Sequence, residues 1–201
     1  MKSKLAISEP LRVGQIRKLR ANKKGGASRL VLIAEQDRRD GTYLVFLLNN
    51  MVEAAIPRDL CLSKDVTSAQ YSIVLMTEYF SRANPEDFEL ESLIGQVQVS
   101  QLEKIRTLAF NNPFGKLPES IVGDGLVIGS FPIQKYDAIW NYRVAEFDNF
   151  AKLTYVRDTN SADYAVRFLT QNPVLNDPLL VDECPLDVLY ALSRTGELVA
   201  A

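Results

Sequence analysis

Between residues 12 and 80 the chain repeats one pattern, in which a short apolar run is followed by a cluster of turn residues. Runs of this length that are rich in Val, Ile, Leu and aromatic residues are typical of β-strands. The five runs are RVGQIRKLR (12–20), RLVLIAE (29–35), TYLVFLLN (42–49), EAAIPRDLCL (53–62) and AQYSIVLMTEYF (69–80). Five short strands at this spacing predict a small β-barrel.

The segments between the first three runs have the composition of hairpin loops. NKKGGAS contains Gly25 and Gly26, which accept a positive φ without steric cost, and QDRRDG ends in Asp40-Gly41, a strong turn signal. We therefore expect the first three strands to be neighbours in one antiparallel sheet.

A helix is predicted after the strands, over VSQLEKIRTLAF (99–110). Ser100 can cap its amino terminus, with Glu103 three residues later, and Leu102, Ile105, Leu108 and Ala109 fall on one face. The following NNPFG ends the helical pattern.

The composition changes after residue 115. Residues 116–201 hold seven basic and twelve acidic residues, and they contain a turn with a short strand (GDGLVIG, 123–129), a mixed aromatic segment (131–147) and two helix candidates (161–171 and 185–196). The prediction is an α+β chain with two parts: residues 1–115, an SH3-like barrel with a helix, and residues 116–201, an acidic α/β extension of unknown role. Because no low-complexity linker joins them, we expect the two parts to pack together.

Several classes of chemistry are excluded by what the chain lacks. It has no histidine, and Cys61 and Cys184 are its two cysteines, too few for a disulfide framework or a Cys-x-x-Cys metal pair. We expect no cofactor and no metal, so acid–base chemistry must use carboxylates, Tyr, Lys or Arg. The longest apolar run, Tyr43–Leu48, is far shorter than a membrane span. We therefore expect a soluble cytoplasmic protein without a membrane partner.

Charge is unevenly distributed along the chain. Residues 1–29 hold nine Lys or Arg against one acid, Glu9, whereas the remainder holds 14 basic and 24 acidic residues. Such a separation favours either an anionic partner at the basic end or one half of the molecule that shields the other.

The order of these features resembles the MazF/Kid/PemK-like family of toxin endoribonucleases. The matching stretches are VGQI (13–16), GGASRLVLIAEQD (25–37), TYLVFLLNN (42–50), AAIPRDLCL (54–62) and IGQVQVSQLEKIRTLAF (94–110), so that the likeness covers roughly residues 11–114. The resemblance implies an SH3-like barrel followed by a helix, a homodimer, an antitoxin-like protein partner and single-stranded RNA as the substrate. It also implies cleavage without metal, in which the ribose 2′-hydroxyl attacks the adjacent phosphorus.

The resemblance also assigns roles to individual residues. Arg29 stands where the family carries its catalytic arginine, before the second strand, and Asn49 stands where the family carries a catalytic Thr or Ser. Asn49 departs from the pattern because an amide cannot replace a hydroxyl in proton transfer. The basic residues around the first loop would bind the RNA backbone by charge; these are Arg17, Lys18, Arg20, Lys23 and Lys24.

Each of these assignments has a structural alternative. Arg29 could form an ion pair with Glu35 or Asp37, Asn49 could be a turn residue, and the basic loop could be a solvated hairpin. The aromatic residues could stack on bases or pack in the core, and core packing is favoured; these are Tyr79, Phe80, Tyr136, Trp140 and Tyr142.

Two functions therefore remain open. One is a toxin-like ribonuclease, or a degenerate relative of one, that binds single-stranded RNA and whose acidic half covers the RNA face. The other is a non-enzymatic SH3-like module that binds a protein or a nucleic acid.

Overall fold

The computed structural model describes residues 9–21, 27–89, 91–111, 117, 122–132 and 138–154. The strands are β1 (Gln15–Leu19), β2 (Arg29–Gln36), β3 (Tyr43–Asn49), β4 (Asp59–Leu62), β5 (Ile73–Ala83), β6 (Gly95–Gln96) and β7 (Leu126–Ile128). The α-helices are α1 (Lys64–Thr67), α2 (Val99–Asn111) and α3 (Ala138–Thr154), and the 3-10 helices are η1 (Val52–Ala54) and η2 (Pro85–Asp87).

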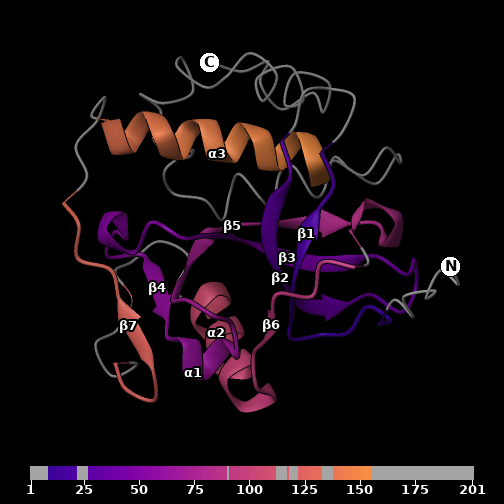
Figure 1. The fold of residues 1–201 in the computed structure, drawn as a ribbon, viewed down its shortest axis with the longest axis horizontal. Helices are drawn as coiled ribbons and strands as arrows, with labels where there is room; N and C mark the ends of the chain where they lie inside the picture. Colours follow the sequence, from indigo (N-terminus) through magenta and orange to yellow (C-terminus); the bar gives the residue numbers. More distant parts are fainter. Residues whose placement is uncertain are drawn as a thin grey trace, which may run out of the picture.

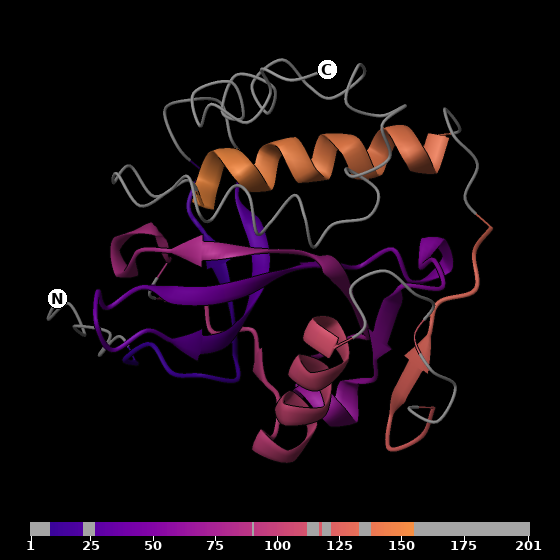
Figure 2. The same ribbon diagram turned by 180° about the vertical axis from the view of Figure 1, so that it is seen from behind.

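The strands in the described part of the chain form one antiparallel sheet in the order β6-β1-β2-β3-β5-β4-β7. The sheet curls into a partial barrel, with α1 and α2 on one side and α3 across the other (Figures 1 and 2). The α+β class and the barrel-like sheet are therefore confirmed. The five predicted strands correspond to β1–β5, and β6 and β7 extend the two edges.

Side-chain alternation along the strands gives the sheet two apolar faces. Leu32 of β2 packs in a cluster with the α2 residues Leu102 and Ile105, whereas its neighbours Val31 and Ile33 pack in a second cluster on the α3 side. The sheet is thus the middle layer of three, and each face is covered by a helix.

Two predicted elements differ from the structure in their bounds. The fourth strand starts at Asp59 rather than Glu53, because the peptide N–H of Asp59 bonds to the carbonyl of Ile56 at 2.8 Å and turns the chain at Pro57. Helix α2 starts at Val99, with the N–H of Leu102 bonded to the carbonyl of Gln98 at 2.9 Å. The N-cap is therefore Gln98 and not the predicted Ser100.

Elements from the predicted second part pack on the first. β7 pairs with β4, with Cys61 opposite Val127, and α3 packs on β5. The predicted helices at 161–171 and 185–196 lie outside the described residues, and the division at residue 115 stays a prediction.

Helix α3 was not predicted, since its segment was interpreted only as mixed and aromatic. Its buried positions include Arg143, Phe147, Phe150 and Thr154, spaced by three or four residues as one face of a helix requires. Because Arg143 is charged, the buried face of α3 does not show as a continuous apolar stripe in the sequence.

A substitution at Phe150 tests whether α3 is part of the core. Its side chain is fully buried in the cluster on the α3 side. Phe150→Ala should lower the free energy of unfolding by about 3–5 kcal/mol, because a large cavity replaces the ring. Urea denaturation measures the change. The control Val99→Ala, at a side chain 69% exposed, should change stability by about 0.5 kcal/mol or less, and equal effects of the two variants would contradict the assignment.

Candidate functional site

The structure brings Arg29 and Asn49 to one end of the sheet. β2 begins at Arg29 and β3 ends at Asn49, and these strands pair with Leu30 opposite Leu48. Arg29 directly precedes Leu30 and Asn49 directly follows Leu48, so the two residues lie one position beyond this pair at the same end of the two strands. By alternation they share a face with Val31, which packs in the cluster on the α3 side.

The Arg29 guanidinium forms an ion pair with a carboxylate of α3. Arg29 Nη2 lies 2.7 Å from Glu146 Oε1, and Nη1 donates to the Ser28 carbonyl at 3.0 Å. The side chains of Arg29 and Glu146 are 16% and 12% exposed. Arg29 Nε is buried, and no described group accepts a hydrogen bond from it.

Arg29 thus forms an ion pair, but not with the predicted strand carboxylates. Glu35 pairs with Arg106 of α2, and Asp37 pairs with Arg82 of β5. The partner of Arg29 comes from 117 residues further along the chain, a separation that local sequence patterns do not reveal.

Asn49 acts as a turn residue in this structure. Its Oδ1 accepts a hydrogen bond from the Met51 N–H, as in an Asx turn, and its Nδ2 lies 3.9 Å from Met76 Sδ. Its side-chain carbonyl is therefore engaged by the chain itself.

A second ion pair joins α3 to the sheet and is almost completely buried. Arg143 Nη1 and Nη2 donate to the two carboxylate oxygens of Asp59 at 2.7 and 3.3 Å, and these side chains are 5% and 1% exposed. The Ile56 N–H also donates to Asp59, at 3.0 Å, and the Arg143 guanidinium lies 5.2 Å from the centre of the Tyr79 ring. Burial raises the pKa of Asp59, and Arg143 opposes this shift.

Tyr142 of α3 is close enough to Glu146, Arg29 and Arg143 to interact with them electrostatically. It precedes Glu146 by four residues, one turn of α3. Burial raises the pKa of the Tyr142 phenol, and the Glu146 carboxylate raises it further, whereas Arg29 and Arg143 lower it. The sheet end that carries Arg29 is thus lined by a phenol and a carboxylate of α3.

Apolar contacts hold α3 in the same place. Phe147, Phe150 and Leu153 are buried in the cluster on the α3 side, and the ring of Phe147 lies 5.6 Å from that of Tyr79. Tyr79 is 2% exposed, so it is a core residue, as the favoured interpretation of the aromatic residues predicted. Burial of three such side chains contributes about 1.5–3 kcal/mol each.

The other predicted RNA-binding residues do not form one surface with Arg29. Arg17 is fully buried and bonds to the Gln15 side chain and the Glu9 carbonyl, and burial lowers its pKa. It therefore adds nothing to an exposed basic surface. Its neighbour Lys18 is exposed, but it lies opposite Leu30 and hence on the α2 side of the sheet.

The remaining basic residues of that region are Arg20, Lys23 and Lys24. Arg20 is exposed, and its Nε donates to the Phe88 carbonyl at 2.9 Å. Lys23 and Lys24 lie outside the described residues.

Sequence reasoning missed Asp59, Arg143 and Glu146 as members of this region, whereas Tyr142 was considered as an aromatic residue that could stack on bases or pack in the core. Two signals were available: a charged residue at the start of the apolar run DLCL, and an arginine at helical spacing from Phe147 and Phe150. Charged side chains in otherwise apolar patterns are seldom buried unless they are paired.

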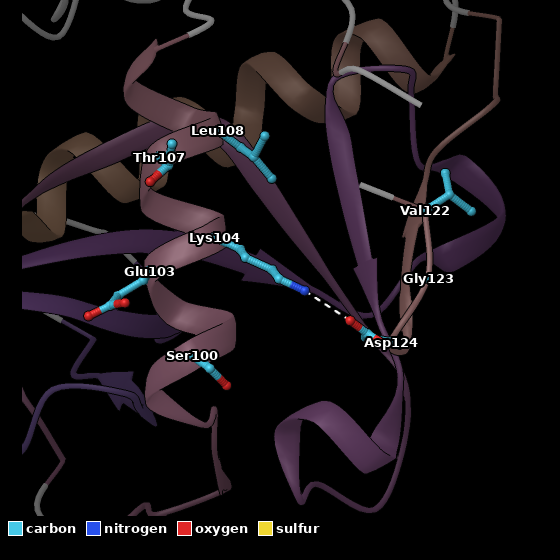
Figure 3. Close-up of a pocket in the computed structure, with 8 residues that line it drawn as sticks. All are labelled: Ser100, Glu103, Lys104, Thr107, Leu108, Val122, Gly123 and Asp124. Atoms are coloured by element: carbon cyan, nitrogen blue, oxygen red, sulfur yellow. Dashed lines mark hydrogen bonds and ion pairs between the residues drawn. The ribbon is translucent and has the colours of Figure 1, made fainter. Parts of the chain in front are cut away.

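A separate groove of about 560 Å³ lies between α2 and the β7 turn (Figure 3). Lys104 and Asp124 form an ion pair at 2.9 Å across it, and their side chains are 52% and 69% exposed. The groove is open and lacks a buried charged group, so it is a weaker candidate than the end of the sheet beneath α3.

Among the residues that the structure describes, no cluster of three or more Cys, Asp or Glu side chains could hold a metal ion. No helix within the described ranges has the length and apolar character needed to span a bilayer.

The buried ion pair generates a prediction for stability. Asp59→Asn should lower the free energy of unfolding by about 3–5 kcal/mol, because Arg143 is left charged and buried without its counterion. Asp59→Asn/Arg143→Met should recover much of this loss. Urea denaturation compares both with Asp124→Asn, which breaks an exposed pair and should have little effect. A loss in Asp59→Asn no larger than in Asp124→Asn would show that the pair does not anchor α3.

No protein-family model matches the chain. No curated protein matches it either. One solved structure with a similar backbone is an endoribonuclease in complex with its cognate antitoxin, from a mycobacterial species, which is 16% identical and aligns over 53% of this chain and 100% of that chain with a TM-score of 0.39. A TM-score this low carries no argument about the site.

Proposed function

We propose that this chain is a toxin-like RNA-binding protein of the MazF/Kid/PemK kind, either a metal-independent endoribonuclease or a degenerate relative, whose RNA face is closed by α3. The observation that carries the proposal is the position of Arg29 and Asn49, which lie on one face at the same end of the sheet. The family resemblance assigns both residues, and the pairing of β2 with β3 places them close together.

The chemistry of RNA cleavage explains why Arg29 matters. The 2′-oxygen forms a bond to phosphorus as the bond to the 5′-oxygen breaks, one proton leaves the 2′-hydroxyl and another reaches the leaving oxygen. A guanidinium binds the phosphate oxygens on which charge accumulates. In this proposal Arg29 has that role and Asn49 contacts the RNA through its amide.

The position of helix α3 supports the part of the proposal in which α3 covers the RNA face. Glu146 is a carboxylate bound where a phosphate would bind. In this proposal α3 does within one chain what a separate antitoxin-like protein does in the family that the sequence resembles. An external protein partner and the homodimer remain predictions.

The second candidate function is a non-enzymatic interaction module. It is favoured by the use of Asn49 in a turn and by the absence of a hydroxyl at that position. RNA cleavage separates the two candidates, and RNA binding separates an RNA module from a protein module.

The experiment uses the full chain, because α3 fills the core on one side of the sheet and its removal would expose that face. Purified protein is incubated with labelled single-stranded RNA in EDTA, and both binding and cleavage are measured. Arg29→Ala should weaken binding about tenfold or more, since a charge-assisted hydrogen bond to phosphate is lost. Any cleavage should be lost with it.

Arg38→Ala is the matched control, because Arg38 is exposed at the opposite end of β2 and the charge change is the same. It should bind RNA as the unchanged chain does. Equal binding by the Arg29→Ala and Arg38→Ala variants would contradict the proposed site, and RNA binding without cleavage would assign the chain to the degenerate class.

A further inference from the structure

The Arg29 guanidinium would form a complete oxyanion-binding site if the Glu146 carboxylate moved away from it. A phosphate or carboxylate binds a guanidinium most strongly through two parallel N–H groups. Here Nη1 is held by the Ser28 carbonyl, Nη2 by Glu146, and Nε is buried with no acceptor among the described residues. Removal of the Glu146 carboxylate alone would free the adjacent Nε and Nη2 as a pair.

The two ion pairs of α3 differ in how easily they separate. The Arg143–Asp59 pair has two hydrogen bonds and is 5% and 1% exposed, whereas the Arg29–Glu146 pair has one and is 16% and 12% exposed. Water therefore reaches the Arg29–Glu146 pair more readily, and hydrogen bonds to water compensate for the loss of that ion pair. Phe147 and Phe150 of α3 are buried in the cluster on the α3 side, an apolar contact separate from the Arg29–Glu146 pair.

We propose that Glu146 is an intramolecular competitor for the Arg29 site, and that an RNA phosphodiester displaces its side chain while α3 remains anchored by Asp59 and Arg143. This inference rests on the proposed function for the identity of the ligand. It adds that inhibition is local: the side chain of one glutamate moves, and the helix does not dissociate.

Charge and geometry favour a phosphodiester as the competing ligand. Nε, which has no acceptor among the described residues, and Nη2, once Glu146 has moved away, present two N–H donors side by side. These two donors match two oxygens of one phosphate. The hydrogen bond from Nη1 to the Ser28 carbonyl holds the guanidinium in its orientation. A neutral ligand would gain too little from Arg29 to displace a carboxylate.

The test measures RNA affinity in Glu146→Gln. Binding of a labelled single-stranded oligonucleotide is followed by fluorescence anisotropy in EDTA. Glu146→Gln should bind about tenfold more tightly than the unchanged chain, because a neutral amide competes less well than a carboxylate for the guanidinium. The gain should disappear in Arg29→Ala/Glu146→Gln.

Asp148→Asn is the matched control for the change in charge. Asp148 lies on the same helix, and its carboxylate pairs with Lys152 rather than with the sheet. It should bind RNA as the unchanged chain does. If the unchanged chain binds RNA through Arg29 but Glu146→Gln binds no better than Asp148→Asn, the inference fails and the proposed function stands.

Two further outcomes are decisive. Absence of Arg29-dependent RNA binding in both the unchanged chain and Glu146→Gln would overturn the proposed function together with the inference. Weaker RNA binding in Glu146→Gln would overturn the inference alone, because the carboxylate would then be part of the RNA site.

Hydrogen exchange on the RNA complex tests whether inhibition is local. Peptides that cover Phe147–Thr154 should keep their protection when RNA binds, because the anchor stays in place. Loss of protection across this segment would show that α3 leaves the sheet and would contradict the local mechanism. A thermal melt of Glu146→Gln close to that of the unchanged chain confirms that the variant is folded.

Discussion

The buried contact between Asp59 of β4 and Arg143 of α3 determines how α3 lies on the sheet, and the candidate site depends on that placement. Each charge is almost fully withdrawn from water, so each requires the other. Because Asp59 belongs to the sheet and Arg143 to a helix 84 residues later, their contact fixes which face of the sheet α3 covers. Glu146 lies one turn further along the same helix, and its contact with Arg29 follows from that placement.

The strands could be predicted from the sequence because their signal is local. The apolar runs of β1, β2 and β3 and the turn at Asp40-Gly41 show the expected alternation and turn chemistry, and the structure has these elements within a few residues of the predicted bounds. The fourth strand begins later than predicted because Asp59 turns the chain at Pro57, a contact that a propensity argument does not include.

The candidate site could be predicted only in part. Arg29 and Asn49 lie at adjoining strand ends, so their proximity follows from the hairpin between β2 and β3. The partner of Arg29 could not be predicted, since Glu146 reaches it only through the long-range packing of α3. Arg17 was expected to bind the RNA backbone as one of the basic residues around the first loop, yet it is buried and donates to the Gln15 side chain and the Glu9 carbonyl.

The proposed mechanism requires that Glu146 closes the Arg29 site while Asp59 and Arg143 hold α3 in place independently. A crystal structure of the full chain with an RNA oligonucleotide whose attacking 2′-hydroxyl is replaced by hydrogen tests it most directly, because that ligand binds without being cleaved. We expect phosphate oxygens within hydrogen-bond distance of Arg29 Nε and Nη2, Glu146 turned away, and the Arg143–Asp59 pair intact. RNA bound elsewhere with the Arg29–Glu146 pair intact would contradict it.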